Sequence, residues 1–228
     1  MPVFRFRAAS RPLNASRRTF CLRMLIALAM AAAGTATADT ARAAAAQQDG
    51  NTVQAKANKA EVPAKENFHL YLLIGQSNMA GRGAMQDEDR VPRDGILMLN
   101  ARQQWVPAAH PLHFDKSIAG VGLGLSFAET MAKKKPGVTI GLVPCAVGGT
   151  PLSRWSKDGD LYKKAVERAK QAMADGQLKG ILWHQGESDS GSEKTAATYA
   201  KRLAQMITDL RQELGDPNVP FVVGELGP

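Results

Sequence analysis

The chain has 228 residues, with 29 Lys and Arg against 21 Asp and Glu and a formal charge of +8. Hydrophobic residues make up 44% and charged residues 22%, ordinary values that exclude a wholly disordered chain, a collagen-like fibre and a disulfide scaffold. Most of the excess charge belongs to residues 1–38, which carry six arginines and no acidic residue. Since the remainder has 23 basic and 21 acidic residues, charge gives no reason to expect a nucleic-acid partner.

Residues 1–38 have the layout of a secretory signal peptide. A basic stretch (Met1–Arg23) precedes an apolar run (Met24–Ala33) and an A-x-A triplet, Ala36–Ala38. The apolar run is shorter than the roughly 20 residues that a spanning helix needs, so no stable membrane anchor is expected. Ser16–Phe20 (SRRTF) also resembles a twin-arginine signal, and both export routes stay open. We expect a periplasmic or secreted protein.

Residues 39–66 are rich in Ala, Gln, Asn and Lys and show no apolar period, which predicts a flexible linker. The folded domain is expected over residues 67–228, a length typical of a single domain. Cys21 lies in the predicted signal, so Cys145 is the lone thiol of the exported chain and no internal disulfide is expected.

The domain is predicted to alternate strands and helices. Short apolar runs predict five buried strands, at Phe68–Ile74, Gly95–Asn100, Val138–Val143, Gly180–His184 and Pro220–Glu225. Periodic segments predict three helices, at Val121–Lys135, Leu161–Ala174 (N-cap Asp160, end Gly176) and Glu193–Leu214 (N-cap Ser192, end Gly215). This alternation predicts a parallel sheet covered on both faces, in which ligands bind beyond the carboxyl ends of the strands.

The first strand is followed by Gly75–Gly81 (GQSNMAG). Ser77 falls where the chain leaves the sheet, in a tight turn that Gly75 permits. Its hydroxyl is a candidate nucleophile, and its N–H can help to hold an oxyanion. The alternative is a turn serine that bonds to its own backbone.

The third predicted strand is followed by Cys145–Thr150 (CAVGGT). Its adjacent glycines let the backbone approach a ligand closely and present an N–H to negative charge. Arg154 and Trp155 follow and could line a substrate cleft. The alternative is a flexible connection with a capping Thr.

The fourth predicted strand leads into Trp183–Asp189 (WHQGESD). The Gln185 amide offers two donors and suits an oxyanion site. Glu187 could orient a histidine, hold neighbouring backbone or form an ion pair. His184 and Glu187 do not share a helical face and have no evident third ligand, so no metal site is expected.

The motifs GQSNMAG, VGGTPLSRW and WHQGESD, each after a predicted strand and in this order, resemble the SGNH-hydrolase superfamily. More narrowly, they resemble the sialate O-acetylesterase and acetylxylan esterase group (carbohydrate esterase family 6), over nearly all of residues 68–228. The resemblance implies a flavodoxin-like three-layer α/β sandwich with a mainly parallel sheet. It also implies a serine esterase, without a cofactor, that removes O-acetyl groups from carbohydrates of sialate or xylan type through an acyl-enzyme.

The same resemblance implies roles for particular residues. Ser77 matches the nucleophile. Its N–H, the backbone of Gly149 (less so Gly148) and the Gln185 amide match the oxyanion hole, and Glu187 matches an acid partner or a structural support. We place four residues on the substrate side of the site, namely Gln76, Asn78, Arg154 and Trp155.

The family takes its catalytic histidine from an Asp-x-x-His motif near the C-terminus. The histidines of this sequence, none of which lies in such a motif, are His69, His110, His113 and His184. Because the sequence stops just past a predicted core strand, we expect a C-terminally incomplete sandwich without its general base, a group that commonly contributes about 10²–10⁴-fold to rate. His113 could be recruited as a base, although a structural or substrate-side role is favoured. The alternative function is a non-catalytic carbohydrate-binding protein.

Dinucleotide binding is not favoured. The glycines of Gly120–Gly124 lack the G-x-G-x-x-G spacing, and we interpret them as a helix entry packed close to the sheet. The oligomeric state is not predicted.

Overall fold

The computed structural model describes residues 59–226, so the predicted signal and most of the predicted linker lie outside the described residues. Six strands form one sheet in the order β3-β2-β4-β1-β5-β6. In chain order they are β1 (Phe68–Gly75), β2 (Ile96–Leu99), β3 (Trp105–Pro107), β4 (Thr139–Pro144), β5 (Gln177–His184) and β6 (Phe221–Val223). All neighbouring pairs are parallel except β2 and β3.

The central strand, β1, shows why the strand runs are continuously apolar. Leu70 and Leu72 pack into the cluster on one face of the sheet, while Tyr71 and Leu73 pack into the cluster on the other. A strand that is covered on both sides must be apolar at every position. All five predicted strands form, with boundaries shifted by a few residues, and four of them are buried. The fifth, β6, was expected to be buried but leaves Val222 and Val223 exposed, because it is an edge strand of the sheet.

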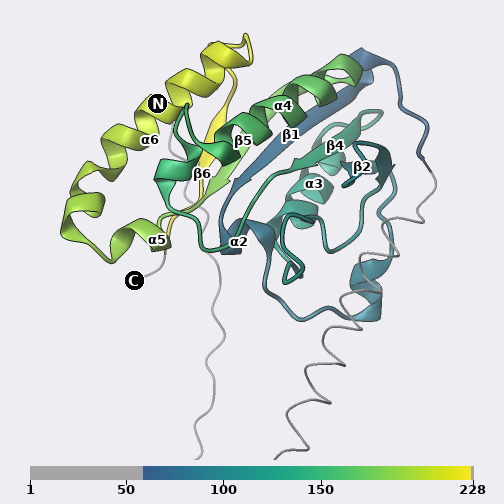
Figure 1. The fold of residues 1–228 in the computed structure, drawn as a ribbon. Helices are drawn as coiled ribbons and strands as arrows, with labels where there is room; N and C mark the ends of the chain where they lie inside the picture. Colours follow the sequence, from purple (N-terminus) through teal and green to yellow (C-terminus); the bar gives the residue numbers. More distant parts are fainter. Residues whose placement is uncertain (1–58, 227–228) are drawn as a thin grey trace, which may run out of the picture.

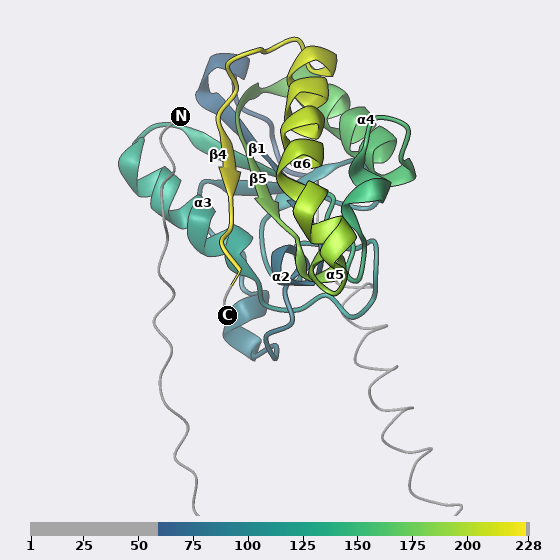
Figure 2. The same cartoon turned by 90° about the vertical axis from the view of Figure 1, so that its left-hand side faces the viewer.

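Helices cover both faces of the sheet (Figures 1 and 2), with α3 on one side and α4 and α6 on the other. The helices are α2 (Ser77–Ala80), α3 (Leu123–Lys134), α4 (Asp160–Asp175), α5 (Glu187–Ser190) and α6 (Glu193–Glu213), with 3-10 turns η1 (Lys65–Asn67), η2 (Asp87–Arg90) and η3 (Leu152–Trp155). The predicted three-layer α/β architecture is confirmed. No helix in the described part of the chain is both long and apolar enough to cross a membrane.

The strand β3 was not predicted. It has only three residues and pairs antiparallel with β2 at the sheet edge. Trp105 fixes it there, because its ring packs edge-on against Phe68 at 4.7 Å and its Nε1 donates to Asp175 at 2.8 Å. A segment held by one aromatic anchor has too short an apolar run for a sequence pattern to reveal it.

Helix boundaries agree with expectation more closely than their caps do. Gly176 ends α4 as predicted, but the N-cap of α4 is Gly159, and Asp160 is the first helical residue. The Asp160 carboxylate is paired with Arg154 instead of capping. Ser192 holds the N-cap position of α6 without a side-chain capping bond.

Of the glycines around the start of α3, Gly124 packs close to the sheet as the sequence predicted, whereas Gly120 and Gly122 pack against Gly83 and Gly81. A methyl group on Gly124 would lie 2.8 Å from the side chains of Leu73 and Leu112. This contact lets α3 approach the sheet closely.

The last part of the predicted linker differs from expectation. The Ala60 N–H donates to the Trp105 carbonyl at 2.8 Å, and Ala60 and Val62 pack against the core. The ordered domain therefore begins before residue 67, because a few small apolar side chains there cover the sheet edge.

Candidate active site

The three sequence motifs follow three neighbouring strands. β4, β1 and β5 lie side by side and parallel, with Leu73 opposite Pro144 and Gly75 opposite His184. Their carboxyl ends share one edge of the sheet, where Figures 1 and 2 show α2 and α5 close together. Ligands in open parallel sheets bind at such an edge, so the motifs form one candidate site.

The turn after β1 requires glycine. Gly75 has φ +134°, and a methyl group there would lie 2.2 Å from the His184 carbonyl oxygen. The next N–H, of Gln76, donates to that same oxygen at 2.9 Å. This sharp exit makes Ser77 the first residue of α2, where it is partly exposed. Among residues 59–226, no partner bonds to the Ser77 hydroxyl, unlike a turn serine bound to its own backbone.

Gly148, the first glycine of the pair after β4, lies against Ser77. A methyl group on Gly148 would be 3.6 Å from the Ser77 Cα and 2.0 Å from Nη2 of Arg82. Gly149 is exposed, with φ +73°. No acceptor in the described part of the chain takes a hydrogen bond from the Gly149 N–H, so this donor is available to a ligand.

His113 supports the second loop from behind. Its Nδ1 accepts a hydrogen bond from the Ala146 N–H at 3.0 Å, and its Nε2 is buried without a partner in the described residues. Burial lowers the pKa of His113 to about 3, so the ring is neutral at pH 7 and can accept that bond. The ring therefore has a structural role in the loop, and its position does not make it a recruited base.

Two further residues near His113 support the same loop, Asp115 through Arg168 and Lys116 directly. Asp115 pairs with Nη1 of Arg168 at 2.7 Å, and that nitrogen also donates to the Pro144 carbonyl at 2.8 Å. Lys116 donates from Nζ to the Gly148 carbonyl at 2.6 Å. Sequence analysis missed this support because the partners lie up to 53 positions apart.

The Gln185 amide is buried, with 2% of its surface exposed. Its Nε2 lies 3.2 Å from Oε1 of Gln76, 3.1 Å from the Thr150 carbonyl and 2.8 Å from Oδ2 of Asp189. The Tyr199 hydroxyl lies 2.6 Å from the Gln185 backbone carbonyl oxygen and 2.9 Å from Oε1 of the side chain. The structure therefore places Gln185 and the equally buried Gln76 as links between the three loops. A free oxyanion donor at Gln185 and a substrate contact at Gln76 do not fit this burial.

Asp189, which accepts a hydrogen bond from Gln185, was not singled out from the sequence. Its carboxylate accepts from the Leu152 N–H at 2.8 Å, from Gln185 and from Arg202 at 2.9 Å. Burial alone would raise the pKa of Asp189, but these hydrogen bonds hold that pKa below its usual value. The only sequence feature that pointed to Asp189 was its position, four residues after Gln185 in the short helix α5.

Glu187 and Asn78 meet across the site. The Asn78 amide donates to Oε1 of Glu187, while Oε2 of Glu187 is buried without a partner in the described residues. Asn78 is exposed, as a substrate-side residue would be. Glu187 thus holds a side chain of α2, and no hydrogen bond joins it to a histidine within residues 59–226.

Trp155 and Arg154 were expected to line a substrate cleft, but the structure places them elsewhere. Trp155 is 1% exposed and packs edge-on against Trp183, with ring centroids 5.5 Å apart, while its Nε1 donates to Thr150 at 3.1 Å. Trp155 is a core residue because its large apolar ring fills the space under η3. Arg154 is exposed, and its Nε donates to Asp160 at 2.9 Å, so its guanidinium is engaged on the α4 side.

All four histidines of the chain lie in the described part, and none forms a hydrogen bond there with Ser77. His184 has an unpaired, buried Nδ1, and burial lowers its pKa. A methyl group on Gly224 would lie 2.4 Å from its Cδ2, so the segment after β6 covers this ring. Within residues 59–226, no group of three His, Cys, Asp or Glu side chains is arranged to hold a metal ion.

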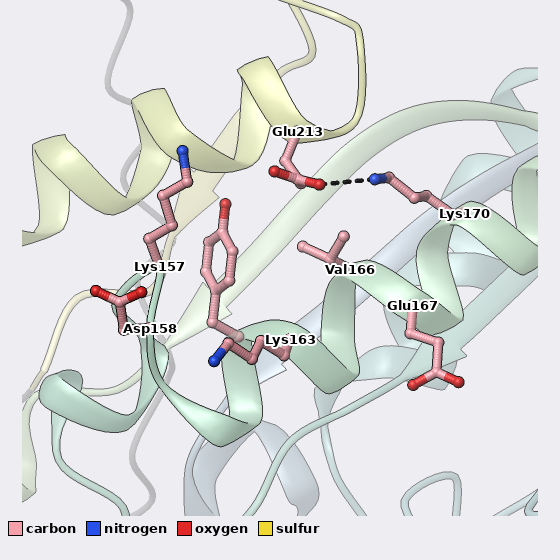
Figure 3. A pocket seen from close by; sticks show the side chains of 8 residues that line it. Lys157, Asp158, Lys163, Val166, Glu167, Lys170 and Glu213 are labelled. Atoms are coloured by element: carbon pink, nitrogen blue, oxygen red, sulfur yellow. Dashed lines mark hydrogen bonds and ion pairs between the residues drawn. The ribbon is translucent and has the colours of Figure 1, made fainter.

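A cavity of about 530 Å³ lies elsewhere, between α4 and α6 (Figure 3). Lys170 and Glu213 form an ion pair of 2.7 Å at its wall. It is lined by Lys157, Asp158, Tyr162, Lys163, Val166, Glu167, Lys170 and Glu213. None of these residues belongs to the three loops, so this cavity is separate from the candidate active site.

Comparison with known proteins assigns the chain to a family. The family described as "carbohydrate esterase, sialic acid-specific acetylesterase" matches residues 67–228. The probable carbohydrate esterase At4g34215 of Arabidopsis thaliana is 33% identical over 196 residues, which are 76% of this chain and 75% of that protein.

Two solved structures share the fold. The X-ray structure of the Arabidopsis thaliana protein AT4G34215 has a TM-score of 0.64 and 34% identity, covering 69% of this chain and 73% of that one. The crystal structure of NanS has a TM-score of 0.60 at 20% identity, covering 72% of this chain and 69% of that one, and supports the fold alone. The chain belongs to the carbohydrate esterase family of sialic acid-specific acetylesterases, an SGNH-type group of carboxylic-ester hydrolases.

Proposed function

We propose that this chain removes O-acetyl groups from carbohydrates through an acyl-enzyme on Ser77. One observation carries the proposal: Ser77 is partly exposed at the start of α2, with the Gly148 backbone against it and a Gly149 N–H that no described acceptor engages. A nucleophile next to available backbone donors is the arrangement that acyl transfer requires.

In the proposed reaction, the Ser77 oxygen attacks the acetyl carbonyl and forms a tetrahedral oxyanion. The N–H groups of Ser77 and Gly149 would hold that negative charge. The sugar then leaves as an alcohol, and water releases acetate from the serine. The Ser77 proton needs an acceptor, and we assign none among the four histidines, because none bonds to Ser77 in the described residues.

Membership of the family supports a proposal for the substrate class. We propose acetylated carbohydrates of sialate or xylan type, encountered outside the cytoplasm because residues 1–38 have a signal-like layout. The exposed Asn78 would lie on the substrate side of the site.

A second candidate function is carbohydrate binding without turnover. It is favoured because no histidine forms a hydrogen bond with Ser77 within residues 59–226. A serine without a general base is a weak nucleophile at neutral pH.

The deciding experiment is acylation of the purified chain. We expect p-nitrophenyl acetate to leave one acetyl group on Ser77, detected by peptide mass spectrometry, and acetylated sialate or xylan to release acetate. Ser77→Ala should abolish both, while Ser126→Ala, at an exposed position of α3, should change neither. Unchanged hydrolysis by Ser77→Ala would reject the nucleophile. Glycan binding without acyl-enzyme would support the second candidate.

A further inference from the structure

Lys116 holds the peptide unit that carries a proposed oxyanion donor. Its Nζ donates to the Gly148 carbonyl oxygen at 2.6 Å. A trans peptide is planar, and its C=O and N–H point in opposite directions. A bond that fixes the Gly148 carbonyl therefore also fixes the direction of the Gly149 N–H.

The loop itself does little to fix that direction. Gly148 and Gly149 have no side chains, and Gly149 has φ +73° with nothing within 4 Å of the position its Cβ would take. Glycine reaches positive and negative φ about equally easily, so a Gly-Gly peptide can rotate at low cost. The Thr150 hydroxyl closes the segment by donating to the Val147 carbonyl at 2.7 Å, but no bond within the loop engages the Gly148 carbonyl or the Gly149 N–H in the described residues. A contact from outside the loop can therefore select the orientation of this peptide.

Lys116 is well placed to provide that contact, because its segment is already attached to the same loop. His113 accepts a hydrogen bond from the Ala146 N–H, and Asp115 is tied to Arg168. These bonds fix the backbone next to Lys116 relative to the loop, which keeps its exposed and flexible side chain within reach of the Gly148 carbonyl.

We propose that Lys116 is a positioning residue of the esterase, which orients the Gly148–Gly149 peptide so that the Gly149 N–H faces the Ser77 side. The positive charge on the carbonyl also polarises the peptide and strengthens its N–H as a donor. The inference rests on the proposed function for its effect on rate, but the orientation of the peptide can be tested on its own.

The kinetic test compares Lys116→Met with Lys116→Arg. The Met variant keeps the apolar stem and loses the donor, so we expect kcat for p-nitrophenyl acetate to fall about 10-fold, less than the 10²–10³ that follows removal of an oxyanion donor. KM should change less than about 2-fold, because ground-state binding is not involved. Arg can donate to the same carbonyl and should recover most of kcat. Lys133→Met, at the exposed end of α3, is the matched control.

A second measurement does not depend on activity. With ¹⁵N-glycine labelling, the Gly149 amide should give one sharp resonance in the natural chain and in Lys116→Arg, and a shifted or broadened one in Lys116→Met. If Ser77 is not acylated, the proposed function is rejected. The Gly149 resonance still tests whether Lys116 orients the Gly148–Gly149 peptide. An unchanged Gly149 resonance, or a Met variant whose kcat equals that of the natural chain when Ser77 does acylate, would overturn the role of Lys116. Equal losses in kcat and stability without recovery by Arg would overturn it too.

Discussion

The Gln185 side chain donates to Oε1 of Gln76 at 3.2 Å, joining two residues 109 positions apart. Gln76 precedes Ser77, and Gln185 also reaches the Thr150 carbonyl after the glycine pair. One buried amide therefore ties the nucleophile loop to the loop of the proposed oxyanion donor. Donors that are fixed before the reaction need no reorganisation when charge develops, which is how such sites gain rate.

Replacing Gln185 by Leu should destabilise the fold. The volume is nearly kept, but Asp189, the Gln76 amide oxygen and the Thr150 carbonyl each lose a buried hydrogen bond from Nε2, while the Tyr199 hydroxyl keeps the Gln185 backbone carbonyl. We expect the free energy of unfolding, measured by urea titration, to fall by about 2–4 kcal/mol. Gln212→Leu, on the exposed side of α6, should change it by less than about 0.5 kcal/mol.

Loss of activity without loss of stability would instead support Gln185 as an oxyanion-hole donor. If Gln185→Leu kept its stability and lost about 10²–10³ in kcat, the amide would be a free donor in solution.

The sequence predicted where the site lies better than what its side chains do. The runs around Leu72, Leu142 and Ile181 are recognisable because each strand is buried on both faces. Since ligands bind at the carboxyl ends of parallel strands, the order of runs and loops alone is enough to place Ser77 and Gly149 in one site.

The partners of the loop residues were not predictable in the same way. Trp155 was expected in a cleft and lies in the core, and Gln185 was expected to be free and is saturated. Spacing reports which residues share a strand or a helix face. It does not report which buried group, often 50 or more positions away, satisfies a polar side chain. The role of Asp189 depends on how α5 and η3 pack against each other, which no local pattern encodes.

Gly75→Ala should destabilise the domain severely. The new methyl group would lie 2.2 Å from the His184 carbonyl oxygen, and φ +134° is strained for any residue with a Cβ. Strain and collision together should lower the free energy of unfolding by about 3 kcal/mol or more. Chemical denaturation followed by circular dichroism measures the change.

The matched control for Gly75 is Gly191→Ala, at the end of α5. Gly191 has φ −73° and nothing within 4 Å of the added methyl group. Its unfolding free energy should rise by at most about 1 kcal/mol, because alanine restricts the unfolded chain. Equal effects of the two substitutions would show that the exit from β1 is not sterically fixed.

Acid should destabilise the domain in two windows, because Asp189 and His113 both have lowered pKa values in the folded chain. For Asp189, a folded pKa below its usual 3.8 means that the unfolded chain takes up protons first as the pH falls. Its stabilisation is complete above 3.8 and is lost as the pH falls through the folded pKa. For His113, the pKa falls from 6.5 to about 3, so stability is lost between these values.

Substitutions separate the windows. His113→Asn keeps an acceptor for the Ala146 N–H and cannot titrate, so stability should vary less between pH 6.5 and 3 than in the natural chain. Asp189→Asn should be less stable at pH 7, because Arg202 loses its buried counter-charge, and should lose little more below pH 3.8. Urea unfolding midpoints taken across this pH range give both slopes. A slope unaltered by His113→Asn would mean that the ring is charged in the folded chain, and the bond from Ala146 could then not form as described.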